Sequence, residues 1–347
     1  MRARLLLTTM LAALLAACAA TVIDGAGSAG TKPRFAHDIA SETRPWNHGR
    51  FDADKDKFTF AVFSDLTGGE REGVFSVAAE QLRLLRPEFV IGVGDLIEGG
   101  SEDRGQLARE WESFDSRAAR TVGPVFYVGG NHDLINPVQW DVWQARYGPR
   151  FYHFVYRNVL FLVLDTEDNP ARRQQEIHQK RLQALQRVAV EGWGIYAQTE
   201  YSQMQETHTG TIGAEQSEYF QNVIAGYPAV RWTFLFMHKP AWLKPGEENF
   251  LAIEDALAGR PYTVFNGHNH DYIYRPRRGR DYIQLGTTGG VQLPGKQKAV
   301  DHLTLVTVSE SGVDIANLEL AGIFDKTGHV PLNGEGLCFE AAACGSE

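Results

Sequence analysis

The chain has 347 residues, of which 43% are hydrophobic and 22% are charged, and its formal net charge at pH 7 is −9. This composition is typical of a folded globular protein, and the length is enough for one large domain or two average ones. The acidic balance argues against a general nucleic-acid binder, because such proteins meet phosphates with clustered Lys and Arg. An anionic substrate can still bind where metal ions supply the local positive charge.

The first 17 residues have the pattern of an export signal. Arg2 and Arg4 form a basic start, and the apolar stretch that follows, residues 5–17, is 13 residues long. A membrane-spanning helix needs roughly 20 residues. Residues 15–18, which read Leu-Ala-Ala-Cys, resemble the lipobox of bacterial lipoproteins. This resemblance implies cleavage before Cys18 and attachment of lipid to that residue. An ordinary secretory signal and a transmembrane anchor are the two alternatives.

The residues around this signal also bear on location. Ala19 is small and apolar, whereas an aspartate there would resemble a signal for retention at the inner membrane. We therefore expect an exported protein, anchored by lipid in the cell envelope, at the outer membrane and facing the periplasm. In that oxidising compartment Cys338 and Cys344 form a disulfide that closes the end of the chain, or remain two free thiols.

Regular secondary structure is expected from residue 58 onward. Residues 18–57 mix Gly, Pro and charge with little periodicity, and we interpret them as a tether and an N-terminal arm. The elements expected next are a strand at 58–63, a helix at 75–85, a strand at 89–93, a helix at 107–120 and a strand at 125–128. Strands that alternate with helices imply right-handed βαβ units and a parallel sheet.

The middle of the chain contains an unusually long connection. Strands are expected at 159–164 and 231–237, and residues 166–230 lie between them. This insertion is rich in Arg, Gln and Glu, and helices are expected at 172–190 and 214–225. It either caps a site or forms an excursion on the surface.

The C-terminal part reads as a run of short strands. They are expected at residues 262–264, 272–274, 282–285, 303–308 and 313–318. We interpret them as a second sheet packed on the first, which makes the fold class α/β. The domain then spans residues 58–320, and residues 321–347 form a C-terminal tail with a weak pattern.

Side chains that bind metals recur in five short segments, which are residues 63–68, 94–98, 130–133, 238–240 and 267–270. The first three follow expected strands, whose carboxyl ends meet at one edge of a parallel sheet. The segments supply carboxylates, a carboxamide and imidazoles from Asp65, Asp95, Asn131, His238, His268 and His270. Such mixed donors suit Mn, Fe or Zn better than Ca or Mg. Two ions bridged by a carboxylate can activate water and hold a phosphate group.

In this order, the five segments resemble those of the calcineurin-like metallophosphoesterase superfamily, over roughly residues 58–320. The resemblance implies a sandwich of two sheets flanked by helices. It also implies two divalent transition metal ions and a metal-bridging hydroxide that hydrolyses phosphomonoesters or phosphodiesters.

The resemblance also implies a role for each residue. Asp65 and His270 correspond to ligands of the first metal, and Asp95 corresponds to the carboxylate that bridges both ions. The second metal would be completed by Asn131, His238 and His268. His132 corresponds to a histidine that binds phosphate or protonates the leaving oxygen, which is worth roughly 10²–10⁴-fold in rate.

One position departs from the family pattern. The first segment of the family usually reads Asp-x-His, and this chain has Thr67 in the place of the histidine. A hydroxyl is a poor ligand, and losing even an outer partner of a metal site typically costs 10–100-fold in affinity or activity. Thr67 is therefore an uncertain ligand, and the first site is expected to be weak or vacant unless another group compensates.

Glu98 is the residue that can compensate. It lies three residues after Asp95, where many family members carry an acidic residue that orients the acid histidine, here His132. In purple acid phosphatases, which also lack the first histidine, the same place carries a metal-binding tyrosine. Glu98 therefore orients His132, binds the first metal, or is a solvated glutamate; we favour orientation.

A second departure follows directly. Protein phosphatases carry an arginine after the position of Glu98, and this chain has Gly99. One phosphate-binding cation is thus missing, which argues against a serine/threonine protein phosphatase. Lys239, beside His238, is an alternative cation.

Two functions are consistent with these features. The first is a lipid-anchored metallophosphoesterase that acts on a phosphoester. The alternative is a metal-binding envelope protein with weak or lost catalysis, because its first-metal site lacks the histidine.

Overall fold

The computed structural model describes residues 21–22, 36–37, 54–293, 295–296, 298–340 and 344. The predicted signal peptide 1–17, the lipidation site Cys18 and most of the tether 18–57 lie outside the described residues. The chain divides into two compact units, Met1–Lys57 and Phe58–Glu347. In the first unit, β1 (Thr21–Val22) pairs antiparallel with β2 (Ala36–His37).

The second unit contains two sheets, and the first has five strands in the order β13-β12-β3-β4-β5. The strands are β3 (Phe58–Phe63), β4 (Val90–Val93), β5 (Val125–Val128), β12 (His302–Ser309) and β13 (Gly312–Glu319). The first three are parallel, as the alternation of strands and helices predicts, and β12 runs antiparallel to both of its neighbours.

The second sheet has six strands in the order β10-β11-β9-β8-β7-β6. They are β6 (Tyr152–Tyr156), β7 (Val159–Val163), β8 (Trp232–Met237), β9 (Tyr262–Asn266), β10 (Ile273–Arg277) and β11 (Arg280–Gln284). Its four inner strands are parallel, and β6 and β10 are antiparallel edges.

The expectation that the C-terminal strands form a sheet of their own is wrong. Strands β9 to β11 extend the sheet that β7 and β8 begin, whereas β12 and β13 cross over to the sheet of β3. The reason lies in β3, which is almost wholly buried and needs a hydrogen-bonding partner on each edge. Strand β4 pairs with one edge of β3, and β12 pairs with the other.

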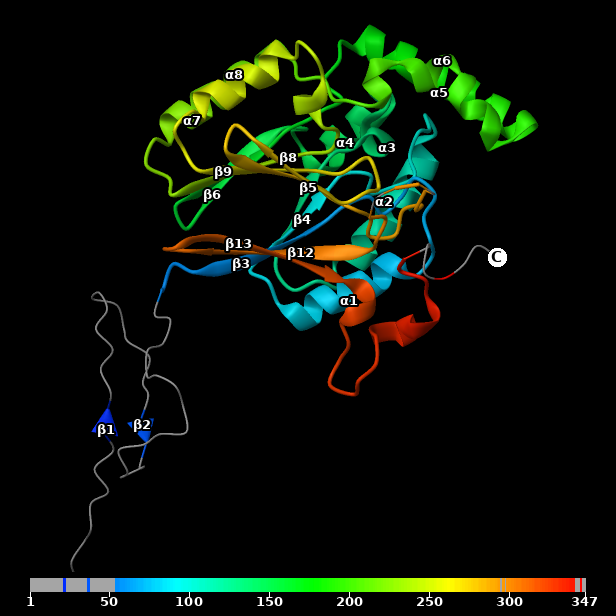
Figure 1. Cartoon of the computed structure of the whole chain (residues 1–347). Coiled ribbons are helices and arrows are strands. Elements are labelled where there is room, and N and C mark those ends of the chain that lie inside the picture. The colour runs from blue at the N-terminus through cyan, green and yellow to red at the C-terminus, as the bar shows by residue number, and fades with distance from the viewer. Residues whose placement is uncertain are drawn as a thin grey trace, which may run out of the picture. The chain divides into compact units, whose positions relative to one another are not determined.

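Helices cover the outer face of each sheet (Figure 1). On the five-stranded sheet lie α1 (Val74–Leu85), α2 (Arg104–Ala118), α3 (Asn131–Leu134) and α4 (Pro137–Tyr147). On the six-stranded sheet lie α7 (Ala214–Gly226), η3 (Ala241–Leu243) and α8 (Glu248–Ala256). A third apolar core, rich in phenylalanine, fills the space between the sheets. None of the described helices combines the length and apolar character needed to span a bilayer.

The insertion folds into helices of its own. They are α5 (Ala171–Glu191), η1 (Trp193–Gln198), α6 (Glu200–Gln203) and η2 (Gln205–Thr207), and α7 follows. A small apolar cluster joins Ile177 and Ala184 of α5 to Tyr201 of α6 and to Ile135, just after α3. The insertion therefore packs on the segment that follows β5.

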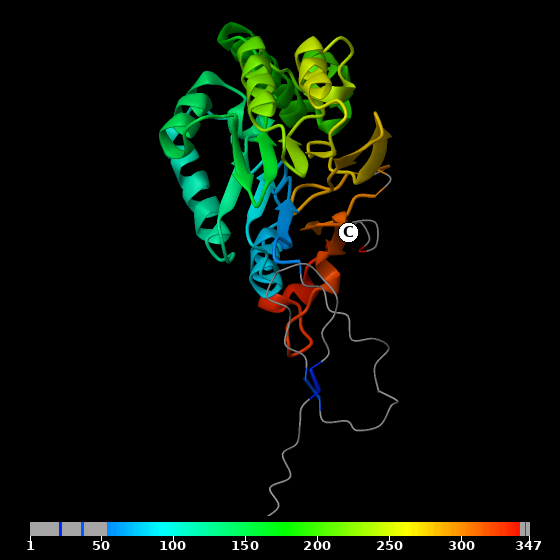
Figure 2. The same ribbon diagram turned by 90° about the vertical axis from the view of Figure 1, so that its left-hand side faces the viewer.

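The chain after residue 319 packs on α1. Figures 1 and 2 both show its short helices, η4 (Leu320–Gly322) and η5 (Pro331–Gly336), beside α1. Gln81 of α1 donates hydrogen bonds to the carbonyls of Leu320 and Ile323. Near the end of the chain, the sulfur atoms of Cys338 and Cys344 are bonded. Residues 320–340 are thus a packed part of the second unit, although the sequence pattern there is weak.

The core between the sheets generates a test of stability. Phe161 of β7 is fully buried there and its ring contacts those of Phe60, Phe89 and Phe154. Phe161→Ala is expected to lower the free energy of unfolding by roughly 3–5 kcal/mol, measured by denaturant titration. Phe324→Ala is the control, because Phe324 is 62% exposed. Equal effects of the two substitutions would contradict this account of the core.

Candidate metal centre

All five segments lie at the carboxyl ends of strands. Asp65 and Asp95 follow β3 and β4, and Asn131 begins α3 just after β5. His238 follows β8, and His268 and His270 follow β9. Both sheets therefore present their strand ends to one place, as expected for a site in an α/β fold.

The backbone is strained at four of these positions. Asp65, Asp95, His268 and His270 have φ angles between 52° and 77°. This left-handed region is unfavourable for residues with a side chain, and strain of this kind clusters at functional sites. It also occurs at turns elsewhere in this chain, as at Arg157 and Asn158.

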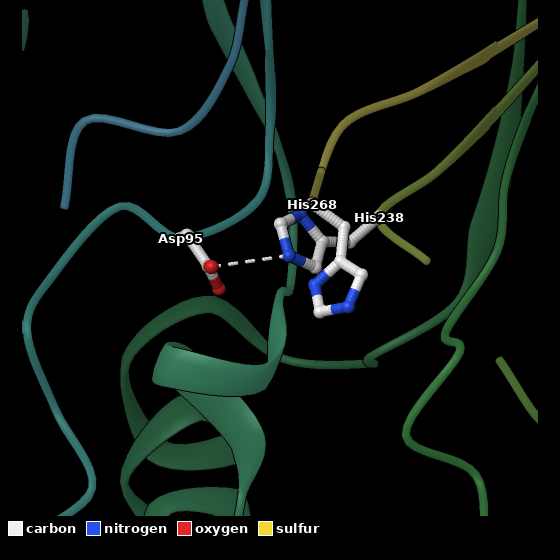
Figure 3. A group of neighbouring side chains, drawn as sticks. All are labelled: Asp95, His238 and His268. Carbon is white, nitrogen blue, oxygen red and sulfur yellow. Dashed lines mark ion pairs between the residues drawn. The ribbon is translucent and has the colours of Figure 1, made fainter. Parts of the chain in front are cut away.

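Donor atoms of Asp95, His238 and His268 lie within 4.8 Å of one another (Figure 3). His238 Nε2 lies 3.1 Å from Asp95 Oδ2. A Cβ atom on Gly130 would lie 2.3 Å from Asp95 Oδ1 and 3.0 Å from His238 Cδ2, so only glycine lets the chain pass there and lead Asn131 to the same place. Asp95, Asn131, His238 and His268 are the residues expected at the second metal.

Two of these donor atoms, Asn131 Oδ1 and His268 Nδ1, are buried without a hydrogen-bond partner in the described part of the chain. His238 Nε2 is buried as well, and its partner there is Asp95 Oδ2. Buried polar atoms are almost always paired, and an unpaired one needs an explanation. A divalent cation explains both unpaired atoms at once, because amide oxygens and imidazole nitrogens are ordinary ligands of Zn, Mn and Fe.

The other nitrogen of each imidazole fixes the orientation of its ring. His238 Nδ1 donates to the carbonyl of Val93 at 2.9 Å, and His268 Nε2 donates to the carbonyl of Thr207 at 2.8 Å. Each bond turns the opposite nitrogen toward the donor group, an arrangement common among metal-binding histidines.

The charges of Asp95 and His238 stabilise each other. Burial opposes the ionised form of Asp95, yet His238 and His132 hold the pKa of Asp95 well below its usual value. Burial likewise opposes protonation of His238, but the charge of Asp95 raises the pKa of His238 to about 9. Burial and the charge of His238 keep the pKa of His268 well below its usual value, so its Nδ1 carries a free lone pair.

A second donor group shares Asp95. Donor atoms of Asp65, Asp95 and His270 also lie within 4.8 Å of one another, and all three residues are buried. His270 Nε2 is 3.3 Å from Asp65 Oδ1, and His270 Nδ1 donates to the carbonyl of Val291 at 2.5 Å. The arrangement thus fits two cations with Asp95 between them.

Thr67 is used by the backbone. Its hydroxyl lies 2.7 Å from the carbonyl oxygen of Ile97 and 3.0 Å from that of Asp95, and it donates to these atoms. The side chain holds the segment after β4 in place, and the group around Asp65 keeps three donor residues.

Glu98 contacts His132 through its main chain. The carbonyl of Glu98 accepts from His132 Nδ1 at 2.7 Å, whereas its carboxylate lies 3.8 Å from the same nitrogen. The carboxylate accepts hydrogen bonds from the main-chain N–H groups of Gly69 and Glu70. Glu98 is absent from both donor groups found in the described part of the chain. The main-chain carbonyl of Glu98, and not its carboxylate as expected, therefore holds the His132 ring.

His132 is also fixed from its own backbone. Its main-chain N–H donates to Asp95 Oδ1 at 2.9 Å. Because His132 Nδ1 binds the carbonyl of Glu98, its Nε2 is the nitrogen left for chemistry. A Cβ atom on Gly68 would lie 3.6 Å from that Nε2 and 3.3 Å from His270 Cε1, so the nitrogen faces the donor group around His270. Burial lowers the pKa of His132, and Arg181 adds to this effect.

The insertion supplies contacts that sequence reasoning missed. The carbonyl of Thr207, in η2, accepts the hydrogen bond that orients His268. Gln174 of α5 donates to the carbonyls of Leu134 and Ile135, at the end of the His132 segment. A main-chain carbonyl has no signature in sequence, so Thr207 could not have been found there.

Lys239 is not a free cation. Its side chain is buried, and its ammonium group contacts Glu167 at 2.6 Å and the carbonyl of Glu206 at 2.7 Å. The interpretation of Lys239 as a replacement for a phosphate-binding arginine is therefore not supported by its contacts.

The shared carboxylate predicts the metal content of variants. Asp95→Asn is expected to weaken the binding of both ions. His268→Ala and His270→Ala are each expected to weaken the binding of a different ion, by at least about 10–100-fold in affinity. The ion on the His270 side should be released first, because its group has fewer donors. Metal analysis after dialysis against graded chelator measures this, with exposed His329→Ala as the control. Unchanged metal content in all three variants would contradict the assignment.

Comparison with known proteins finds solved structures that resemble this chain. A dimetal phosphatase from Danio rerio has a TM-score of 0.52 and 15% identity, covering 76% of this chain and 98% of its own. A purple acid phosphatase from yellow lupin has a TM-score of 0.49 and 13% identity, covering 78% of this chain and 53% of its own. At such identities the likeness is one of fold, and no curated protein matches in sequence. The model of the calcineurin-like phosphoesterase family matches residues 58–272, well over half of the chain, and the protein therefore belongs to that family.

Proposed function

We propose that the protein hydrolyses a phosphomonoester or phosphodiester with the help of two divalent transition metal ions. The observation that carries the proposal is the pair of donor groups that share Asp95, with unpaired buried atoms on Asn131 and His268 beside them. The family model supports the same reaction class.

The proposed ions are Mn, Fe or Zn, because the donors mix imidazole nitrogen with carboxylate and amide oxygen. Such a pair of ions supplies an activated water and neutralises the oxygens of a phosphate group. The protein's own part is to hold Asp95 between the two groups and to turn His238 and His268 toward them through the carbonyls of Val93 and Thr207.

His132 is the proposed acid–base residue. The carbonyl of Glu98 and the carboxylate of Asp95 hold its ring and its backbone, and Nε2 remains available. From this position Nε2 can bind a phosphate oxygen or pass a proton to the leaving oxygen. Glu98 acts through His132 and is a positioning residue.

A test of the reaction uses protein purified without residues 1–18. It is expected to contain transition metal and to hydrolyse nitrophenyl phosphate or bis-nitrophenyl phosphate when Mn is added. His132→Asn is expected to lower kcat by roughly 10²–10⁴-fold while leaving the metal content unchanged. Absence of both bound metal and turnover would refute the proposal.

A second function is favoured by Thr67. Because its hydroxyl faces two carbonyls, the donor group of Asp65, Asp95 and His270 has only three residues. A protein whose site on this side is weak would bind metal in the envelope without efficient catalysis. The same assay separates the two functions, since bound metal without turnover supports the second one.

The proposed location is the cell envelope, with a lipid on Cys18 at the outer membrane facing the periplasm. The support is the lipobox-like sequence of residues 15–18, after a basic start and an apolar stretch. Cys18→Ser is expected to move the exported protein from the membrane fraction to the soluble periplasmic fraction. An unchanged distribution between the two fractions would rule out the anchor.

A further inference from the structure

Arg181 of α5 is half-buried without a partner of opposite charge. In the described part of the chain, it forms no hydrogen bond or ion pair. The other described arginines without such bonds are all exposed, namely Arg86, Arg109, Arg120, Arg172 and Arg275. A partly desolvated guanidinium is unfavourable unless an anion compensates it. Arg181 is therefore positioned for an anionic ligand.

The backbone beside Arg181 leaves space for its guanidinium. A Cβ atom on Gly100 would lie 2.0 Å from Arg181 Nη1 and 2.9 Å from Cζ, so only a glycine permits this approach. Gly99 and Gly100 both have positive φ angles, 52° and 64°. The turn that follows Glu98 thus leaves room for the guanidinium of Arg181, a side chain of the insertion.

The same turn holds His132. Glu98 accepts the hydrogen bond of His132 Nδ1, and a Cβ atom on Gly99 would lie 1.8 Å from the carbonyl oxygen of His132. His132 and Arg181 therefore contact consecutive residues of one short turn.

Packing of α5 fixes the direction of Arg181. Ile177 and Ala184, four residues before it and three after it, are buried against Ile135 and Tyr201. Residues at these spacings share one face of a helix, so Arg181 lies on the face of α5 that packs against Ile135, just after the segment that carries His132. Glu102, which follows the same turn, is not the partner of Arg181, because its carboxylate accepts a hydrogen bond from Gln175.

We propose that Arg181 binds the phosphoryl group of the substrate on the side of His132, and thereby favours a doubly charged phosphomonoester over a phosphodiester. The proposal rests on the proposed function. A guanidinium can hold two phosphate oxygens at once, which the single ammonium of a lysine does less well. Lys239 is excluded from this role by its ion pair with Glu167.

The experiment compares Arg181→Gln and Arg181→Lys in the full chain with Arg172→Gln, an exposed arginine of the same helix. Affinity for inorganic phosphate is measured by calorimetry on metal-loaded protein, and KM and kcat are measured with the two nitrophenyl substrates. Arg181→Gln is expected to weaken phosphate binding and to raise KM for the monoester by roughly 10- to 100-fold. The effect on the diester should be smaller, Arg181→Lys should restore part of the loss, and metal content and Tm should not change.

The outcomes separate this proposal from the proposed function. Lack of metal and turnover in the unmodified protein refutes the function, whatever Arg181 does. The role of Arg181 is overturned if the unmodified protein has no measurable affinity for phosphate, even when the enzyme is active. It is also overturned if the unmodified protein and Arg181→Gln bind phosphate with equal affinity. Equal losses for monoester and diester overturn the preference for the monoester.

Discussion

The structure of the site depends on one buried carboxylate. Asp95 is 2% exposed and takes part in both donor groups, while it also accepts the main-chain N–H of His132. Removing a carboxylate from water costs several kcal/mol, which nearby positive charge must offset. The charge of His238 offsets part of this cost. The residues just before Asp95 and Asn131 are glycines, because the chain there passes too close to the site for a side chain. The two sheets meet at their strand ends, and this brings the positive charge of His238 to Asp95.

The donor residues that follow strands could be placed from sequence, whereas the pairing of the strands could not. Asp65, Asp95 and Asn131 follow short apolar runs, so the end of each run was enough to bring them to one sheet edge. The same pattern did not reveal that β12 returns to β3, because an apolar run indicates that a strand is buried but does not identify its neighbour. Helices α4 and α8 were missed, as was the packing of residues 320–340.

The roles of polar side chains at the site were the least predictable. The hydroxyl of Thr67 and the carboxylate of Glu98 both bind the main chain, although their residue types suggested metal or histidine partners. Lys239 is neutralised by Glu167, which is distant in sequence. In each case a backbone group or a remote charge, invisible to a motif, decides what the side chain contacts.

The bond between His268 and Thr207 has a thermodynamic consequence. It joins a donor of the site to the insertion, 61 residues away in the chain. Cation binding at the site and the ordering of η2 are linked equilibria. If binding of a cation stabilises η2, then an already ordered η2 raises the affinity for the cation by the same free energy. Residues 166–230 therefore contribute to the site through the backbone, and a change that displaces the carbonyl of Thr207 would alter the orientation of His268 without replacing any donor residue.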